Sequence, residues 1–245
     1  MVIGSKTIYH AKVSSTNDVA AELINKGRAY EGMVISAGFQ SKGKGQRNNI
    51  WVSDPFMNLI ISVILLPESI LAEQQFYISK IVSLAITDTL HSFSDQISIK
   101  WPNDIYHGSD KIAGILIENT IIGEKIAASI AGIGLNINQK YFPANIPNPV
   151  SLTQITKKKH KVQVILNELC KKLQSRYISL KDGDYSGIDN SYESRLYHRD
   201  DELQFTTKGG LLKGRIKGVN KLGQLIIETS VGERRVFSYK EIEFL

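Results

Sequence analysis

The first 199 residues alternate short apolar runs with amphipathic stretches, which predicts strands and helices that follow one another along the chain. Strands are expected at residues 6–13, 33–37, 58–66, 97–100, 112–118 and up to 131–138. Apolar residues at helical spacing predict helices from residues 14–17 to about Gly27, from Phe76 to about His91, over 162–177 and, for a turn or two, near 192–197.

From about Asp200 the pattern changes to short strands separated by tight turns. Strands are expected at residues 203–206, 211–219, 225–229 and 234–238. Regular short strands of this kind predict a small β-barrel. We therefore expect a domain boundary near residue 199, with one domain over residues 1–199 and a second over residues 200–245.

The composition narrows the class of protein. A hydrophobic fraction of 42% and a charged fraction of 22% are those of an ordinary globular protein. The net charge of +6 permits an anionic partner without naming one. The single cysteine, Cys170, excludes an internal disulfide framework and a multi-cysteine zinc site. Without a secretory signal or an apolar run of membrane-spanning length, we expect a soluble, cytoplasmic protein with no membrane partner.

Residues 40–51 read Gln-Ser-Lys-Gly-Lys-Gly-Gln-Arg-Asn-Asn-Ile-Trp. Glycines and basic residues in a loop supply the backbone donors and cations that bind a phosphate or carboxylate. Two nucleotide-binding motifs each fail by one residue. Gly45 stands where a phosphate loop needs Ser or Thr, and Asn48 stands where a dinucleotide-binding loop needs Gly. A solvated turn is the alternative from the loop alone.

Three further stretches place polar residues at the ends of elements. Residues 14–17 (Ser-Ser-Thr-Asn) either cap the following helix or hold a polar ligand. Residues 100–104 (Lys-Trp-Pro-Asn-Asp) form an Asn-Asp turn or a polar site at a strand end, and Lys111 is solvated or belongs to that site. The two glycines of residues 131–138 mark a bulge or admit a ligand to the backbone.

In this order, these stretches resemble the biotin protein ligases. The resembling motifs are Ser15-Thr16-Asn17, the loop 40–51, Lys100-Trp-Pro-Asn-Asp104 followed by Lys111-Ile-Ala-Gly-Ile-Leu-Ile-Glu118, and Gly132-Ile-Gly-Leu-Asn136. The family implies an α+β fold, with a mixed β-sheet flanked by helices and then a small SH3-like barrel. It also implies that biotin and ATP react with Mg²⁺ present to give biotinyl-AMP, from which biotin passes to a lysine of a biotin carboxyl carrier protein or domain.

The resemblance also implies residue roles. Lys111, Lys44 and Asp104 would be catalytic, with Asp104 as a magnesium ligand or a proton acceptor. Biotin would be bound by Ser15, Thr16, Asn17, Gln40, Gly43, Lys44, Lys111, Gly114, Ile115, Leu116, Gly132 and Gly134. ATP and the adenylate would be bound by Lys44, Gln46, Arg47, Trp51, Asn103, Asp104, Lys111 and Asn136, with Trp51 covering the adenine.

The chain departs from the family pattern inside the loop. Lys44 stands where the family commonly has Arg, Gln46 where some members have Arg, and Asn48 and Asn49 where some relatives have Gly and Arg. An ammonium makes single contacts where a guanidinium makes a forked pair. Only 13 residues precede Ser14, so we expect no helix-turn-helix and no DNA binding. The expected protein is a monofunctional ligase, acting as a monomer or homodimer.

Two other functions compete with this interpretation. A lipoate-protein ligase would share the fold and the adenylation chemistry, but the Lys-Trp-Pro-Asn-Asp stretch and the barrel argue against it. A nucleic-acid-binding module would use the basic residues of 157–161 and 208–221, although aromatic residues there are sparse for base stacking.

Overall fold

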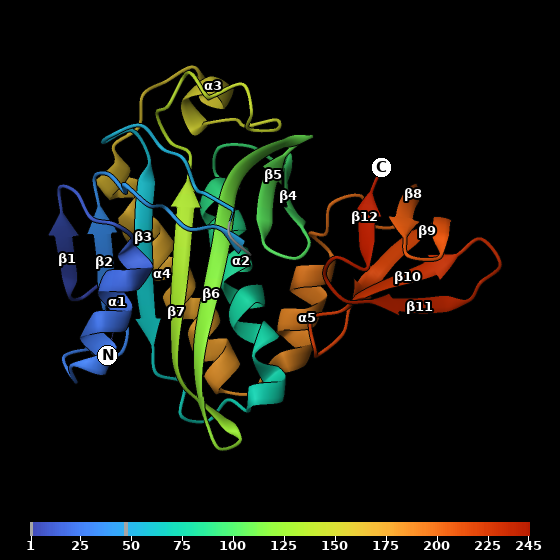
Figure 1. Cartoon of the computed structure of the whole chain (residues 1–245), viewed down its shortest axis with the longest axis horizontal. Helices are drawn as coiled ribbons and strands as arrows, with labels where there is room; N and C mark the ends of the chain where they lie inside the picture. Colours follow the sequence, from blue (N-terminus) through green and yellow to red (C-terminus); the bar gives the residue numbers. More distant parts are fainter. Residues whose placement is uncertain (1, 47–48) are drawn as a thin grey trace.

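The computed structural model describes residues 2–46 and 49–245. Its first part contains a seven-stranded sheet with the order β1-β2-β3-β7-β6-β5-β4, in which β1 and β2 are parallel and all other neighbours antiparallel (Figure 1). The strands are β1 (Thr7–His10), β2 (Val34–Ala37), β3 (Leu59–Leu65), β4 (Ile97–Lys100), β5 (Asp104–His107), β6 (Asp110–Ile122) and β7 (Lys125–Leu135). The sheet is therefore mixed, as the family resemblance implied.

Helices cover both faces of this sheet (Figure 1). Helix α1 (Thr16–Asn25) lies on one face, while α2 (Phe76–Leu90) and α4 (Val162–Lys181) pack together on the other. Two short elements, the 3₁₀ helix η2 (Ala72–Gln74) and α3 (Leu152–Thr156), were not expected from the sequence.

The last helix of the first part does not lie where the sequence predicted it. We expected helical turns near residues 192–197, but α5 spans Tyr185–Glu193. The Asp184 side chain accepts a hydrogen bond from the backbone N–H of Gly187 and so starts the helix earlier. The helix packs against α2 and strand β9.

Strand alternation separates the hydrophobic core from the opposite face of the sheet. On β3, residues Leu59, Ile61, Val63 and Leu65 join the main core with α2 and α4. The residues between them face α1, where a smaller cluster contains Ala20 and Ile64. Near the α1 end of this second face, the central strands carry Ser62, Gly132 and Gly134 in place of large apolar side chains. A hollow is therefore left beside α1.

The C-terminal part forms a separate antiparallel sheet with the order β11-β10-β9-β8-β12 (Figure 1, right). Its strands are β8 (Glu202–Thr207), β9 (Gly210–Val219), β10 (Leu225–Thr229), β11 (Arg234–Phe237) and β12 (Ile242–Phe244), the last not expected from the sequence. The predicted α+β class is confirmed. Phe205 and Leu225 belong to the same core cluster as the first sheet, so the boundary at residue 199 remains a prediction.

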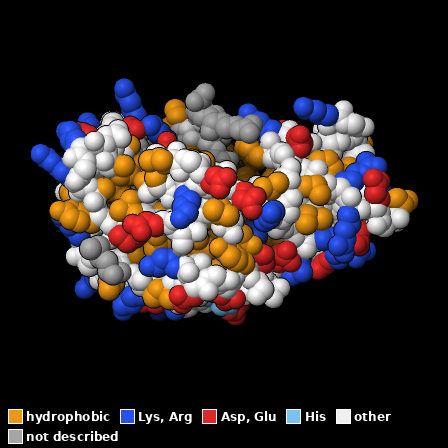
Figure 2. Space-filling model, turned by 90° about the horizontal axis from the view of Figure 1, so that it is seen from below, with side chains coloured by type: hydrophobic (Ala, Val, Ile, Leu, Met, Phe, Trp, Pro, Cys, Tyr) orange, Lys and Arg blue, Asp and Glu red, His pale blue; other side chains and the backbone are white. Residues whose placement is uncertain are grey.

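Three further expectations concern membrane-spanning segments, the single cysteine and the distribution of surface charge. Among residues 2–46 and 49–245, no helix is long and apolar enough to cross a membrane. Burial raises the pKa of Cys170 to about 11, so this thiol is protonated at neutral pH. On the face drawn in Figure 2, acidic and basic side chains are interspersed and form no single basic stripe.

Candidate active site

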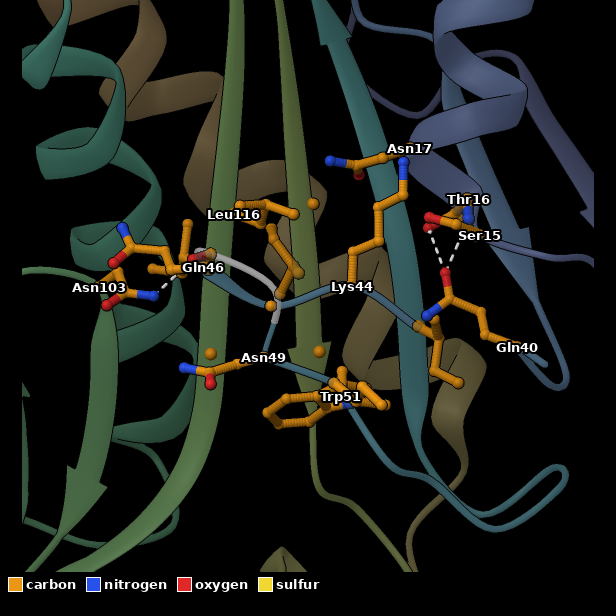
Figure 3. A pocket seen from close by; sticks show the side chains of 18 of the residues that line it. Ser15, Thr16, Asn17, Gln40, Lys44, Gln46, Asn49, Trp51, Asn103 and Leu116 are labelled. Carbon is orange, nitrogen blue, oxygen red and sulfur yellow. Dashed lines mark hydrogen bonds between the residues drawn. The ribbon is translucent and has the colours of Figure 1, made fainter. Parts of the chain in front are cut away.

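A cavity on the α1 face of the sheet gathers most of the predicted site residues (Figure 3). Its volume is about 120 Å³. The predicted residues that line it are Ser15, Thr16, Asn17, Gln40, Lys44, Gln46, Trp51, Asn103, Asp104, Lys111, Gly114, Ile115, Leu116, Gly132 and Gly134. Gly43 and Asn136 are not among the lining residues, and Arg47 lies outside the described residues.

Hydrogen-bonding groups from the start of α1 line one end of the cavity. Ser15 is the N-cap residue, but its side chain makes no capping hydrogen bond. Gln40 Oε1 accepts hydrogen bonds from the backbone N–H of Thr16 at 2.7 Å and from the Thr16 hydroxyl at 3.0 Å. Because a backbone N–H can only donate, the Gln40 oxygen must face Thr16, and Gln40 Nε2 keeps its two donors next to Gly43. The helix start thus supplies polar groups to the cavity.

A buried network of hydrogen bonds joins the start of α1 to the sheet beneath it. The Ser62 hydroxyl lies 2.5 Å from Asn17 Oδ1 and 2.7 Å from Thr16 Oγ1. Asn17 Nδ2 donates to Glu118 Oε2 at 2.5 Å. The Asn17 side chain lies so close to Gly132 that a Cβ there would overlap it. The network therefore fixes the first turn of α1 on strands β3, β7 and β6.

The indole of Trp51 forms part of the cavity wall. It lies on Gly134 and Gly114, and a Cβ at Gly134 would overlap the ring. The loop that carries it folds back on itself, since Trp51 N–H donates to Gly43 O at 3.0 Å and Gly45 N–H to Asn49 O at 2.7 Å. In Figure 3 Asn103 lies on the left and Thr16 and Gln40 on the right, with the Trp51 indole below the space between them.

Asn103, Asp104 and Lys111 form the second end of the cavity. Asn103 is tied to β6 twice: its Nδ2 donates to Ile115 O at 2.8 Å, and its own carbonyl accepts the Ile115 N–H at 2.9 Å. Lys111 Nζ lies 2.7 Å from Asp104 Oδ1 as an ion pair. That approach lacks hydrogen-bond geometry, and Asp104 Oδ1 is buried without a hydrogen-bond partner among the described residues. One cation and one carboxylate thus meet as an ion pair at the strand ends.

A β-bulge turns Lys111 toward this site. On β6, Gly114 faces the cavity and pairs with Asp104, while Ala113 pairs with Ile105. The register then shifts, so that Tyr106 pairs with Lys111 and Ile112 is skipped. Without the shift, Lys111 would alternate onto the opposite face from Gly114; with it, Lys111 shares the face of Asp104.

Lys44 provides a second cation beside the cavity. Its Nζ forms an ion pair with Asp18 Oδ1 in the first turn of α1. The hydrogen bond to Asp18 raises the pKa of Lys44 above its ordinary value against the opposing effect of burial, and the charge of Glu118 adds to the rise. Lys44 is therefore positively charged at neutral pH.

The structure bears on three of the alternatives and roles considered from the sequence. The glycines at 132 and 134 do not mark a bulge, because β7 keeps regular register with both neighbours there. A turn over residues 101–103 joins β4 to β5, and Asp104 is the first residue of β5. Asn136 donates from Nδ2 to Val150 O at 3.1 Å, while its Oδ1 is buried and without a partner among the described residues. Its expected contact with adenine remains a prediction.

Sequence reasoning missed several residues of the cavity wall. They are Gly45, Asn49, Ile50, Ile60, Ile61, Ile133 and Tyr239. Ile60 could have been found from strand alternation, because it pairs with Gly134 on the same face. Tyr239 could not, because it comes from the C-terminal sheet, far away in sequence.

Comparison with known families decides the assignment. The model of the biotin/lipoate A/B protein ligase family matches residues 9–136, which is more than half of the chain. The chain belongs to this family. The matched segment begins in β1 and ends just after β7, so it contains both ends of the cavity and the loop between them.

Individual relatives extend the likeness over the whole chain. This chain is 28% identical to a biotin--[acetyl-CoA-carboxylase] ligase of Paracoccus denitrificans, over 96% of its own length and 98% of that protein. It is also 28% identical to the bifunctional ligase/repressor BirA of Bacillus subtilis, over 97% of this chain and 74% of that one. A biotin protein ligase from Aquifex aeolicus, solved in complex with biotin and ATP, has the same fold, with a TM-score of 0.81, 24% identity and 98% and 99% of the two chains covered.

Proposed function

We propose that this chain is an ATP-dependent biotin protein ligase that forms biotinyl-AMP and transfers biotin to a lysine of a carboxyl carrier domain. One observation carries the proposal: a single cavity joins a cluster of neutral hydrogen-bonding groups at Thr16 and Gln40 to a cationic end at Lys111. Biotin has a polar ureido ring at one end and a carboxylate at the other. The two ends of the cavity match these two groups in order.

The chemistry of the Thr16 end favours biotin over lipoate. The Gln40 amide is oriented by Thr16, so that its Nε2 offers donors to a carbonyl such as that of the ureido ring. The dithiolane ring of lipoate has no group that could satisfy these donors. A buried polar site strongly prefers a substrate that pairs its hydrogen-bonding groups over an analogue that leaves them unpaired.

Adenylation requires two anions to meet. An oxygen of the biotin carboxylate attacks the α-phosphorus of ATP, and the bond from that phosphorus to the bridging oxygen of the β-phosphate breaks, releasing pyrophosphate. Lys111 and Lys44 are cations held at the cavity wall by Asp104 and Asp18. Fixed cations lower the repulsion between the reactants and stabilise the charge of the transition state.

Asp104 would be the protein ligand of a Mg²⁺ ion that also binds the phosphates of ATP. This ion binds proteins through one or two carboxylates and takes its other ligands from substrate phosphates and water. The described residues contain no cluster of three carboxylate, histidine or cysteine ligands, but Asp104 Oδ1 is buried and is paired only with Lys111 Nζ, without a hydrogen bond from the described residues. Asp104 would supply the protein ligand, and the ion would neutralise phosphate charge.

Transfer uses the same end of the cavity. The carrier lysine must lose its proton before its amine attacks the acyl carbon, after which the bond from that carbon to AMP breaks. Asp104 is a carboxylate at the cavity wall that can accept this proton. The electron pair of the broken bond leaves with the phosphate oxygen of AMP, and an amide links biotin to the carrier.

The proposal is tested by incubating the protein with biotin, ATP, Mg²⁺ and an isolated biotin carboxyl carrier domain. We expect AMP to form only when biotin is present, and the mass of the carrier to rise by one biotinyl group. A carrier with arginine in place of its acceptor lysine is the matched control and should stay unlabelled. Failure to form AMP or to label the carrier would contradict the proposal.

A further inference from the structure

Two turns of the C-terminal sheet pack against Trp101, close in sequence to Asn103 and Asp104 of the candidate active site. The first, at residues 220–224, receives a hydrogen bond from Trp101, whose Nε1 donates to Gly223 O at 2.9 Å. The second, at residues 238–241, carries Tyr239, whose ring packs edge-on against Trp101 with centroids 6.1 Å apart. Trp101 is only 5% exposed. Trp101, which directly precedes Pro102 and Asn103, is therefore held in place by the C-terminal sheet.

Hydrogen bonds hold both turns in place. Asn220 Oδ1 accepts the backbone N–H groups of Leu222 and Gln224, each at 3.0 Å. Gln224 Nε2 then donates to Ser238 Oγ at 3.1 Å, and Ser238 N–H donates to Glu241 Oε2 at 2.7 Å. The backbone on either side of Tyr239 is therefore fixed relative to the turn that holds Trp101.

The sheet as a whole is anchored to the helices by a buried lysine. Lys80 on α2 is fully buried, and its Nζ donates to Asp189 Oδ1 on α5 at 2.6 Å and to Val219 O on β9 at 3.3 Å. The ring of Phe76 fills the space beside Gly223, so that a Cβ there would meet it at 2.5 Å. These contacts leave Tyr239 in one position relative to the first sheet.

Tyr239 faces the same cavity as Asn103, Asp104 and Lys111. Of the residues after 199, all of which the structure describes, it alone lines this cavity. We propose that Tyr239 is a substrate-contacting residue, whose ring packs against the nucleoside of ATP and of the adenylate. This inference rests on the proposed function. An aromatic ring suits this role because every base presents a π-face, and such a contact stabilises binding without reading a hydrogen-bond pattern.

The geometry also separates Tyr239 from the biotin end. Its contact with Trp101 places it beside the turn 101–103 and the start of β5, whereas Thr16 and Gln40 lie at the opposite side of the cavity from Asn103 in Figure 3. Loss of the Tyr239 ring should therefore weaken the use of ATP and leave the binding of biotin alone unchanged.

The test compares four variants with the wild type. Tyr239→Ala removes the ring, Tyr239→Leu keeps bulk against Trp101 without a π-face, and Tyr239→Phe keeps the ring. Phe237→Ala is the matched control, because Phe237 is a half-buried aromatic residue of the same sheet that does not line the cavity. The measurements are the KM for ATP in biotin-dependent pyrophosphate release and the Kd for biotin without nucleotide.

We expect Tyr239→Ala and Tyr239→Leu to raise the KM for ATP about tenfold, with Tyr239→Phe and Phe237→Ala within about twofold of the wild type. The Kd for biotin should be unchanged in all four. An unchanged KM for ATP in Tyr239→Leu, or an equal rise in Phe237→Ala, would overturn the inference while leaving the ligase assignment intact. A wild-type protein that releases no pyrophosphate would overturn the proposed function and this inference with it.

Discussion

The indole of Trp51 lies directly on the backbone of Gly134, at a distance that leaves no room for a side chain. Replacing Gly134 by Ala should push the indole off the sheet and deform the cavity wall that it forms. We expect at least about a tenfold loss in affinity for biotin, since displacing a packed aromatic ring costs more than about 1 kcal/mol. Calorimetric titration with biotin measures this.

The control for that substitution is Gly209→Ala. A Cβ at Gly209 would meet only Thr207 Oγ1, at 3.7 Å, which is an ordinary contact. Biotin affinity should be unchanged in this variant. If Gly134→Ala binds biotin as tightly as Gly209→Ala does, the wall formed by Trp51 has no part in binding.

Lys111→Ala should abolish adenylate formation and leave the fold intact. Its ammonium pairs with Asp104 at the cavity wall, and loss of one fixed charge at a reacting phosphate costs about 100-fold or more in rate. The matched control is Lys125→Ala, an exposed lysine at the far end of the same β-hairpin. Single-turnover release of pyrophosphate gives the rate, and circular dichroism confirms folding. Equal rates in the two variants would refute the role of Lys111.

Stability should fall in acid because of Asp88. Its carboxylate accepts hydrogen bonds from Arg176 at 2.8 Å and Arg195 at 2.6 Å. Burial alone would raise the pKa of Asp88, but the two guanidinium groups outweigh it and hold this pKa below its ordinary value of 3.8. The unfolded chain then takes up the proton first as pH falls. The stabilisation is complete above the ordinary pKa and is lost as pH falls through the lowered one.

Asp88→Asn should therefore lower the free energy of unfolding by about 2 kcal/mol at pH 7, and the difference from wild type should shrink as pH falls below the ordinary pKa of Asp88. Urea unfolding at several pH values measures both. Asp95→Asn is the control, because Asp95 is 97% exposed and lies near the same helix end. A pH-independent difference for Asp88→Asn would contradict the ion-pair account.

Lys80→Met tests how the two sheets are joined. Methionine keeps most of the apolar volume of the buried stem but loses the hydrogen bonds to Asp189 and Val219. We expect the free energy of unfolding to fall by about 2 kcal/mol, because Val219 O and Asp189 each lose a charged donor. Tryptophan fluorescence, to which Trp101 between the two sheets contributes together with Trp51, should report the same transition as circular dichroism in the wild type. Two separate transitions in the wild type would instead support independent domains divided near residue 199.

Local sequence predicted the parts of the site that lie on contiguous motifs. Thr16, Gln40, Trp51 and Asn103 all line one cavity, and each stands in a stretch with a distinctive order of residues. Their geometry was not predictable in the same way. Lys111 reaches the cavity because the β6 register shifts by one residue, and neither its neighbours nor their alternation reveal that bulge.

Contacts between segments that are distant in sequence also could not be predicted. The Ser62 and Glu118 side chains join α1 to two strands, although each looks in sequence like a polar residue within an apolar strand. Tyr239 reaches the site only because Lys80 and Trp101 fix the second sheet in place. Such contacts depend on burial and on hydrogen bonds between distant segments, which the local pattern of polar and apolar residues does not predict.

The most direct test of the account is a competition between biotin and lipoate in equal amounts, with ATP and Mg²⁺, and mass spectrometry of the acyl-adenylates formed. The account predicts biotinyl-AMP in at least about 100-fold excess, because lipoate would leave the donors of Gln40 unpaired. Formation of lipoyl-AMP in comparable amount, or of neither adenylate, would contradict it.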